Sequence, residues 1–273
     1  MATVGNILES LDERFPVALA EDWDVNGLTI GLPASEVTRV HFAVDPTIAV
    51  AREAIAYGAQ MLVTHHPLML RGVTTVAADT AKGAVVQALA EAGIALANFH
   101  TGADSAADGV ADALARAVGV EPLAPLIPNA GDPTLGTGRV GNLAAPMTLG
   151  EFADVVAQAL PKTAQGVRIA GDLDAKVATD AVVGGSGDGF LEAARASGAD
   201  VYLTADLRHH PALDARELAL LGDGRPFLVD VAHAASEWAW LAGAADFVAD
   251  RHNVDTYVST LNTDPWTARL DAR

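Results

Sequence analysis

The chain contains no cysteine among its 273 residues. Disulfide bonds, thiolate nucleophiles and sulfur-ligated zinc are therefore excluded. Any metal site must use imidazole and carboxylate ligands, which suit zinc, iron, manganese, cobalt or nickel. Lysine occurs only three times, and the formal net charge is -18. Because such a charge repels a phosphate backbone, nucleic-acid binding through a basic surface is not expected.

Long apolar segments are also missing. No apolar stretch reaches roughly 18 residues, the length that a membrane-spanning helix needs. The N-terminal "MATVGNILESLDERF" has no basic segment followed by an apolar one, so the sequence predicts no signal peptide and a cytoplasmic protein. Hydrophobic residues make up 51% of the chain and charged residues 19%, which indicates a folded protein of one large domain or two small ones.

An alternation of apolar strands and amphipathic helices runs through the first half of the chain. The predicted elements are, in order, strand 39–44, helix 47–58, strand 60–64, helix 80–93, strand 94–98 and helix 105–119. The first three elements form a βαβ unit, whose two strands should be parallel. The Pro- and Gly-rich residues 121–138 predict a linker. After it, Thr148 and Glu151 have the spacing of a helix capping box.

The second half repeats the order of the first. "AIAYGAQMLVTHHP" and "ARASGADVYLTADLRHHP" both read helix, glycine, apolar strand, histidine pair, proline. The sequence therefore predicts two α/β halves, 1–125 and 126–273, with no inserted middle domain. The expected fold class is α/β: an internally duplicated three-layer fold with mixed, partly parallel sheets and a metal cleft between the two halves.

Histidines and carboxylates follow the predicted strands in both halves. His65 and His66 follow strand 60–64, while His100–Asp104 and His233–Glu237 each pair a histidine with an acid four residues later. In open α/β sheets, side chains beyond the carboxyl ends of parallel strands converge on one ligand site. Taken one at a time, these groups are equally typical of helix caps or surface pairs. Their duplication at strand ends favours a metal site, with enough ligands for two ions.

Other motifs predict less chemistry. "VVGGSGDGF" lacks the Walker lysine and the dinucleotide fingerprint, so it indicates a tight turn, and Ser186 is a poor nucleophile candidate. Trp238 and Trp240 are typical of core or subunit packing. His41 and His252 have no partner in the sequence and are assigned no role.

The motifs occur together in one known family. "WDVNGLTIG", "THHP", "HTGAD", "GGSGDGF" and "VDVAHAASE" stand in the order seen in the dinuclear-metal-centre hexameric proteins. The chain resembles this Nif-three-like family, whose members are widely described as GTP cyclohydrolase I type 2 homologues. The resemblance covers nearly the whole chain. It implies a toroidal homo-hexamer with two divalent metal ions per subunit.

The resemblance also implies a ligand set. His65, His66 and Asp104 from the first half and His233 and Glu237 from the second would bind the metals, with Glu237 as a bridge. Two further histidines match family residues close to the site, in catalytic roles as supporting or proton-transfer groups: His100 and His210.

The chain departs from the family pattern without losing a ligand. The asparagine of the family's Trp-Asp-Asn motif is displaced by one position, to Asn26. Before Asp104, the sequence reads "HTGA", whereas the family usually has asparagine after the threonine. Ala205 and Ala232 replace the usual glycines. These changes affect pocket shape and substrate choice.

Two functions of different classes remain open at this point. A bound metal lowers the pKa of water from about 16 to about 7, so the site suits metal-dependent hydrolysis. The resemblance implies a GTP cyclohydrolase type of activity, with a nucleotide or other small molecule as substrate. The alternative is a non-enzymatic protein that stores metal or serves as an interaction scaffold; it needs the same ligands but no substrate pocket.

Overall fold

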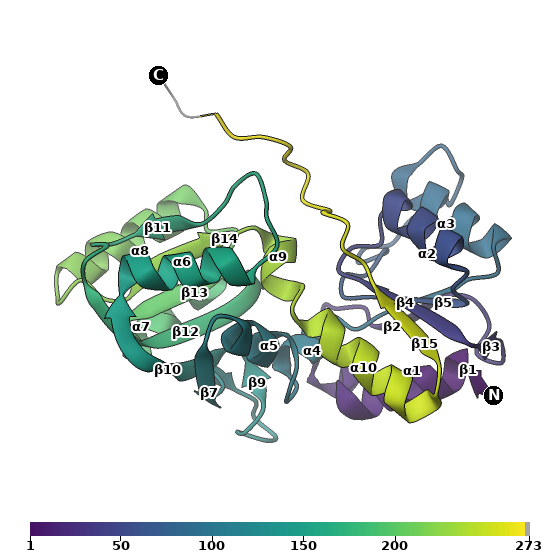
Figure 1. The fold of residues 1–273 in the computed structure, drawn as a ribbon, viewed down its shortest axis with the longest axis horizontal. Coiled ribbons are helices and arrows are strands. Elements are labelled where there is room, and N and C mark those ends of the chain that lie inside the picture. Colours follow the sequence, from purple (N-terminus) through teal and green to yellow (C-terminus); the bar gives the residue numbers. More distant parts are fainter. Residues whose placement is uncertain (271–273) are drawn as a thin grey trace. The chain divides into compact units, whose positions relative to one another are not determined.

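Each of the two units into which the chain divides is built around one β-sheet (Figure 1). The computed structural model describes residues 1–270. The first unit comprises Met1–Ala106 and Trp240–Thr263, and the second comprises Ala107–Ala239 and a segment that begins at Asp264. Among residues 1–270, no helix combines the length and the apolar character that crossing a bilayer requires.

The sheet of the first unit has five strands in the order β15-β4-β5-β6-β2. The strands β15, β4, β5 and β6 run parallel to one another, and β2 runs antiparallel to β6. The parallel βαβ arrangement predicted from the sequence is confirmed. The elements of this unit are β1 (Ala2–Thr3), α1 (Val4–Arg14), η1 (Val17–Leu19), β2 (Gly27–Ile30), β3 (Glu36–Val37), β4 (Arg39–Ala43), α2 (Ile48–Tyr57), β5 (Met61–Thr64), α3 (Ala81–Glu91), β6 (Ala95–Asn98), α4 (Thr101–Ser105), α10 (Trp240–His252) and β15 (Asp255–Val258).

Helices cover both faces of this first sheet (Figure 1). On one face, Val50 of α2 and Leu89 of α3 pack with Leu62 of β5 and Leu96 of β6. On the other, α10 contacts both β4 and α1. Because both faces are covered, the strands read as continuous apolar runs, as parallel sheets usually do.

The second unit has a six-stranded sheet in the order β11-β14-β13-β12-β10-β7. The strands β12, β13 and β14 are parallel, and the other pairings are antiparallel. The elements of this unit are α5 (Val110–Ala117), β7 (Val120–Ala124), β8 (Ile127–Pro128), β9 (Gly136–Thr137), β10 (Arg139–Thr148), α6 (Leu149–Ala159), β11 (Arg168–Ala170), β12 (Lys176–Ser186), η2 (Asp188–Phe190), α7 (Leu191–Ala196), β13 (Val201–Ala205), α8 (His209–Leu220), β14 (Phe227–Val231) and α9 (His233–Glu237).

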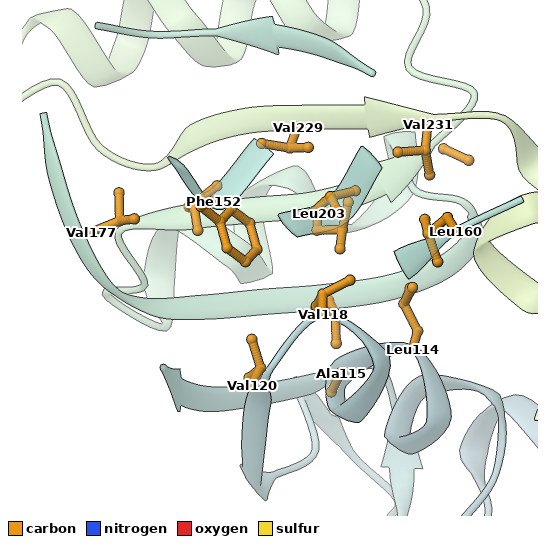
Figure 2. Close-up of a cluster of buried hydrophobic side chains, with 14 of the residues drawn as sticks. Leu114, Ala115, Val118, Val120, Phe152, Leu160, Val177, Leu203, Val229 and Val231 are labelled. Carbon is orange, nitrogen blue, oxygen red and sulfur yellow. The ribbon is translucent and has the colours of Figure 1, made fainter. Parts of the chain in front are cut away.

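The core of the second unit also lies on both faces of its sheet. Figure 2 shows one face, where Leu114 of α5 and Phe152 of α6 are buried with Leu203 of β13 and Val229 of β14. Tyr202 of β13 belongs to a second cluster, which includes residues of α7. Helix, sheet and helix thus form three layers, and the run of adjacent parallel strands has four members in the first unit and three in the second. The predicted duplicated, mixed α/β fold is confirmed.

The predicted linker is wrong in one respect. Its first residues form β7, which pairs antiparallel with β10 at the edge of the second sheet, and later ones form the β8–β9 hairpin. Proline is compatible with an edge strand because it removes a donor that the sheet does not use. The division by contacts also differs from the predicted halves, since residues 107–125 belong to the second unit and residues 240–263 to the first.

A complete capping box begins α6, as predicted. The Thr148 hydroxyl accepts from the Glu151 backbone N–H at 3.1 Å, and a Glu151 carboxylate oxygen accepts from the Thr148 N–H at 2.6 Å. These bonds satisfy two backbone donors that the first helical turn leaves without partners.

Replacing this cap should destabilise the protein measurably. Thr148→Ala removes the hydroxyl acceptor and is expected to lower the free energy of unfolding by about 1 kcal/mol. Thr148→Ser keeps the hydroxyl acceptor, so it should lower the free energy of unfolding by only about 0.3 kcal/mol. Chemical denaturation followed by circular dichroism compares the two, and equal losses would contradict a capping role.

Candidate metal centre

Three histidines meet at the carboxyl ends of two adjacent strands in the first unit. His65 and His66 directly follow β5, and His100 lies two residues beyond the end of the parallel neighbour β6. One ring nitrogen from each of the three lies within 4.8 Å of the others. The pairwise distances between ring centroids are 5.0 to 5.5 Å. His100 therefore lies about as close to the predicted ligands His65 and His66 as these two lie to each other.

Each of these rings is held through its Nδ1 atom. The distances are 3.0 Å from His65 to the carbonyl oxygen of Phe99, 2.7 Å from His66 to Asp45, and 2.7 Å from His100 to Asp24. A carbonyl or carboxylate oxygen can only accept, so Nδ1 must carry the proton and donate. The lone pair of the neutral ring is then on Nε2, which is the usual arrangement of a metal-binding histidine.

Asp24 is the most strongly held of these anchors. Its side chain has no exposed area, and it accepts from Thr101 (backbone N at 3.0 Å, Oγ1 at 2.5 Å) and from Asn26 Nδ2 at 2.8 Å. Burial opposes the charge, but the hydrogen bonds from His100, Thr101 and Asn26 outweigh it and hold the pKa of Asp24 well below its usual range. The displaced Asn26 therefore has a defined role, since its Oδ1 also accepts from the His100 N–H at 2.7 Å.

Asp104 lies on α4, the short helix that follows His100. Its Oδ1 is 3.6 Å from His65 Nε2, and its side chain is 23% exposed. A carboxylate four residues after a histidine on one helical turn faces the same direction as that histidine. The first unit thus gathers all four of its predicted site residues: His65, His66, His100 and Asp104.

The second unit has a matching, smaller group. His233 lies two residues beyond β14, and its Nε2 is 3.1 Å from Glu237 Oε1. Its Nδ1 is 2.7 Å from Asp206, which directly follows the parallel neighbour β13. Glu237 is 3% exposed. His233 and Glu237 correspond in position to His100 and Asp104, so the duplication extends to the site.

The proton on His233 is tightly bound when the ring has only protein partners. Burial disfavours the imidazolium, but the charges and hydrogen bonds of Glu237 and Asp206 outweigh burial and raise the pKa of His233 to about 11. A metal ion would have to displace the Nε2 proton. Metal binding at this residue is therefore expected to strengthen as the pH rises.

The glycines of "GGSGDG" belong to this second group rather than to a phosphate loop. Gly185 has a φ of +69°, and a Cβ built there would lie 2.5 Å from Glu237 Oε1 and 3.2 Å from His233 Nε2. The Gly185 N–H donates to the Ser236 hydroxyl at 2.8 Å. The strand β12 can approach the histidine and the glutamate this closely only because the residue has no side chain.

The second histidine pair does not match the first. His209 and His210 lie in the exposed first turn of α8, with ring centroids 5.0 Å apart, whereas the position equivalent to His65 holds Asp206. Among residues 1–270, no group of three metal-type donors includes His210. Its predicted catalytic role stays a prediction.

His41, His252 and Trp240 contact residues outside the histidine–carboxylate groups or pack in the core. His41 Nε2 lies 3.0 Å from Glu53, and His252 Nε2 lies 2.7 Å from the Ser10 hydroxyl. Trp240 is buried in the first unit against the rings of His65 and Phe15. The three anchoring carboxylates, Asp24, Asp45 and Asp206, were not identified from the sequence. The family motifs contained Asp24 and Asp206 but assigned neither of them a role.

These features define a class: a duplicated α/β protein with histidine–carboxylate groups at the ends of parallel strands. The sequence profile of the Duf34/NIF3 (NGG1p interacting factor 3) family matches residues 2–265, so the chain belongs to this family. It is 49% identical to a Streptomyces coelicolor protein named GTP cyclohydrolase 1 type 2 homolog, over 99% of this chain and 95% of that one. A Mycobacterium tuberculosis protein of the same name is 31% identical, over 96% of each chain.

Solved structures show the same fold. A Bacillus cereus protein related to NIF3 superposes with a TM-score of 0.88 at 26% identity, over 98% of this chain and 99% of that one. A Staphylococcus aureus protein superposes with a TM-score of 0.87 at 29% identity, over the same shares. The predicted membership of the NIF3-like family is confirmed.

The close approach at Gly185 leads to a stability prediction. Gly185→Ala is expected to destabilise the protein by more than Gly198→Ala. Both residues have a positive φ, +69° and +74°, but a Cβ at Gly198 meets nothing within 4 Å. Gly198→Ala should therefore show only the backbone strain of about 1 kcal/mol. Thermal unfolding of both variants measures the difference, and equal losses would contradict the contact with Glu237.

Proposed function

We propose that the histidine–carboxylate groups at the strand ends bind two divalent metal ions and that the protein is a metal-dependent hydrolase. One observation carries the proposal: in all four strand-end histidines, Nδ1 is hydrogen-bonded to a carboxylate or carbonyl oxygen. Partners of this kind fix the ring orientation and raise ligand basicity in metal sites. A surface histidine pair or a helix cap would not need such anchors.

The donor set fits a divalent metal without cysteine. The residues that would hold the ions are His65, His66 and His233, through their imidazoles, and Asp104 and Glu237, through their carboxylates. Nitrogen and oxygen donors of this kind suit zinc, iron, manganese, cobalt or nickel. Such ions, when bound, supply Lewis-acid activation of water and charge stabilisation.

His100 has the geometry of a proton-transfer group. Its Nδ1 donates to the buried Asp24, so the ring is held in one orientation with Nε2 on the side of His65 and His66. Asp24 keeps its negative charge at neutral pH and would stabilise a proton received at Nε2. His100 can therefore accept a proton there and return it to a leaving group. Its proximity to the other rings equally suits a ligand role.

The substrate is proposed from the relatives alone. Those proteins are named GTP cyclohydrolase 1 type 2 homologs, which points to a nucleotide and to hydrolytic opening of a purine ring. The rival is a metal-binding protein without enzymatic activity. The hexameric state and the cytoplasmic location stay predictions.

The anchoring carboxylate of His233 offers a specific test. Asp206→Asn is expected to weaken zinc binding about 10- to 100-fold, because the ring loses a charged acceptor. The matched control is Asp174→Asn, an exposed aspartate on a turn of the same unit, which should bind zinc like the wild type. Competition with a coloured chelator between pH 6 and 8 measures both affinities, and both should rise with pH. Equal affinities in the two variants would rule out the anchoring role.

The metal content tests the proposal directly. Elemental analysis after purification without chelator should find about two metal ions per subunit in the wild type and clearly fewer in Glu237→Ala. Hydrolysis of GTP and of a phosphoester panel should then require the metal and be lost in Glu237→Ala. Two bound metals with no turnover of any substrate would favour the metal-binding protein over the hydrolase. Empty protein after soaking with zinc, iron, manganese and nickel would exclude both.

A further inference from the structure

A cavity of about 370 Å³ lies in the second unit, and none of the proposed metal ligands lines it. It is bounded by the edge strand β11, the neighbouring strand β14 and the first turns of α8. Its apolar lining comes from Ile169, Leu213 and Leu228. Cavities of about 300–1,000 Å³ with an apolar lining and a few polar groups are typical of small-molecule sites.

Three arginines line this cavity, although the protein as a whole has a net charge of -18. Two of them are paired: Arg168 with Asp230, and Arg208 with Asp188. The carboxylate of Asp230 is also engaged by the Leu207 N–H at 2.9 Å. These pairs leave the third arginine to set the charge of the cavity.

Arg216 is half-buried and has no carboxylate to balance it. Its Nη1 donates to the carbonyl oxygens of Gly224 at 2.7 Å and Pro226 at 2.6 Å, and its guanidinium lies 5.4 Å from the ring centre of Phe227. Among residues 1–270, no carboxylate lies within ion-pair distance of it, and no described residue accepts from its Nε or Nη2. Burial accordingly lowers the pKa of Arg216. A half-buried cation is stabilised by an anion, and the protein does not provide one.

The start of α8 adds to the positive character. The helix begins at His209 after Arg208, and no side chain caps its first backbone N–H groups. Both residues line the cavity. The first turn of this 12-residue helix presents the N–H groups of His209 and His210, since Pro211 has none, and the positive end of the helix dipole.

We propose that this cavity binds a small organic anion, with its apolar body against Ile169, Leu213 and Leu228 and its carboxylate or phosphate paired with Arg216. The cavity shares no lining residue with the proposed metal ligands, and the proposal does not depend on the proposed hydrolase activity. The apolar lining and the guanidinium of Arg216 together favour a molecule with an apolar part and an anionic part. A neutral ligand would leave the charge of Arg216 unbalanced, and an inorganic anion would leave the apolar side chains exposed to water.

A fluorescent aromatic anion tests this pairing. The probe 1-anilinonaphthalene-8-sulfonate should bind the wild-type protein saturably, at one site per subunit. Benzoate and phenyl phosphate should displace it, and benzyl alcohol should not. Displacement by phenyl phosphate alone would identify the natural ligand class as a phosphate, and displacement by benzoate alone as a carboxylate.

Two leucines of α8 provide a matched pair of variants. Leu213 and Leu218 are 44% and 47% exposed, but only Leu213 lines the cavity. Leu213→Glu should weaken binding of the probe at least tenfold, because it adds a negative charge to the cavity wall and removes apolar contact. Leu218→Glu adds the same charge outside the cavity and should leave binding unchanged. Equal affinities in these two variants would overturn the proposal.

Arg216→Gln tests the charge itself. It should weaken the anionic probe about tenfold and leave the neutral analogue N-phenyl-1-naphthylamine unaffected. Because Arg216 also holds two backbone carbonyls, its variants are first compared with the wild type by circular dichroism. Arg216→Lys keeps the charge and should retain the preference for the anion. If the wild type bound both probes equally tightly, the cavity would be a simple apolar pocket and the proposal would be wrong.

Discussion

The orientation of four imidazole rings depends on one kind of hydrogen bond, from Nδ1 to an oxygen that can only accept. His65 uses a backbone carbonyl, and the other three rings use Asp45, Asp24 and Asp206. Without these acceptors, each ring could rotate or exchange the positions of its proton and its lone pair. The anchors fix both at once, so the side of each ring that is available for chemistry is decided by residues that need not touch a ligand themselves.

The duplicated sheets explain why the same residue pattern occurs twice. In each unit, a histidine stands two residues beyond a parallel strand, and an acid follows four residues later on a short helix. The residue that follows the neighbouring parallel strand differs between the units. It is His65 after β5 and Asp206 after β13. The first unit therefore supplies a cluster of imidazoles, and the second supplies a buried glutamate beside a single strongly anchored ring. The two units have kept the scaffold and diverged in the donors placed on it.

The sequence predicted the parts of this arrangement that depend on local pattern. Continuous apolar runs identified β5 and β6, the spacing of Thr148 and Glu151 identified a helix start, and the histidines after the strands marked the places where the side chains cluster. The anchors could not be found in this way, because Asp24 is 76 residues from His100 and Asp206 is 27 from His233. His209 and His210 matched the first pair in letters but not in position, because residues 206–208 separate them from the end of β13. The Pro- and Gly-rich residues after α5 looked like a linker because edge strands tolerate both residue types.

The first unit takes α10 and β15 from the C-terminal part of the chain, and this affects how the chain folds during synthesis. Its strand β4 acquires its outer neighbour β15 only when residues 255–258 have emerged from the ribosome, after the bulk of the second unit. Phe15, which directly follows α1, likewise lacks Trp240 until that residue has been made; in the folded protein the two ring centres are 5.3 Å apart. An unpaired, apolar strand edge is a template for association with other chains. The nascent protein therefore passes through a stage in which the unit that was made first cannot be completed, and the order of synthesis favours the second unit as the first to fold.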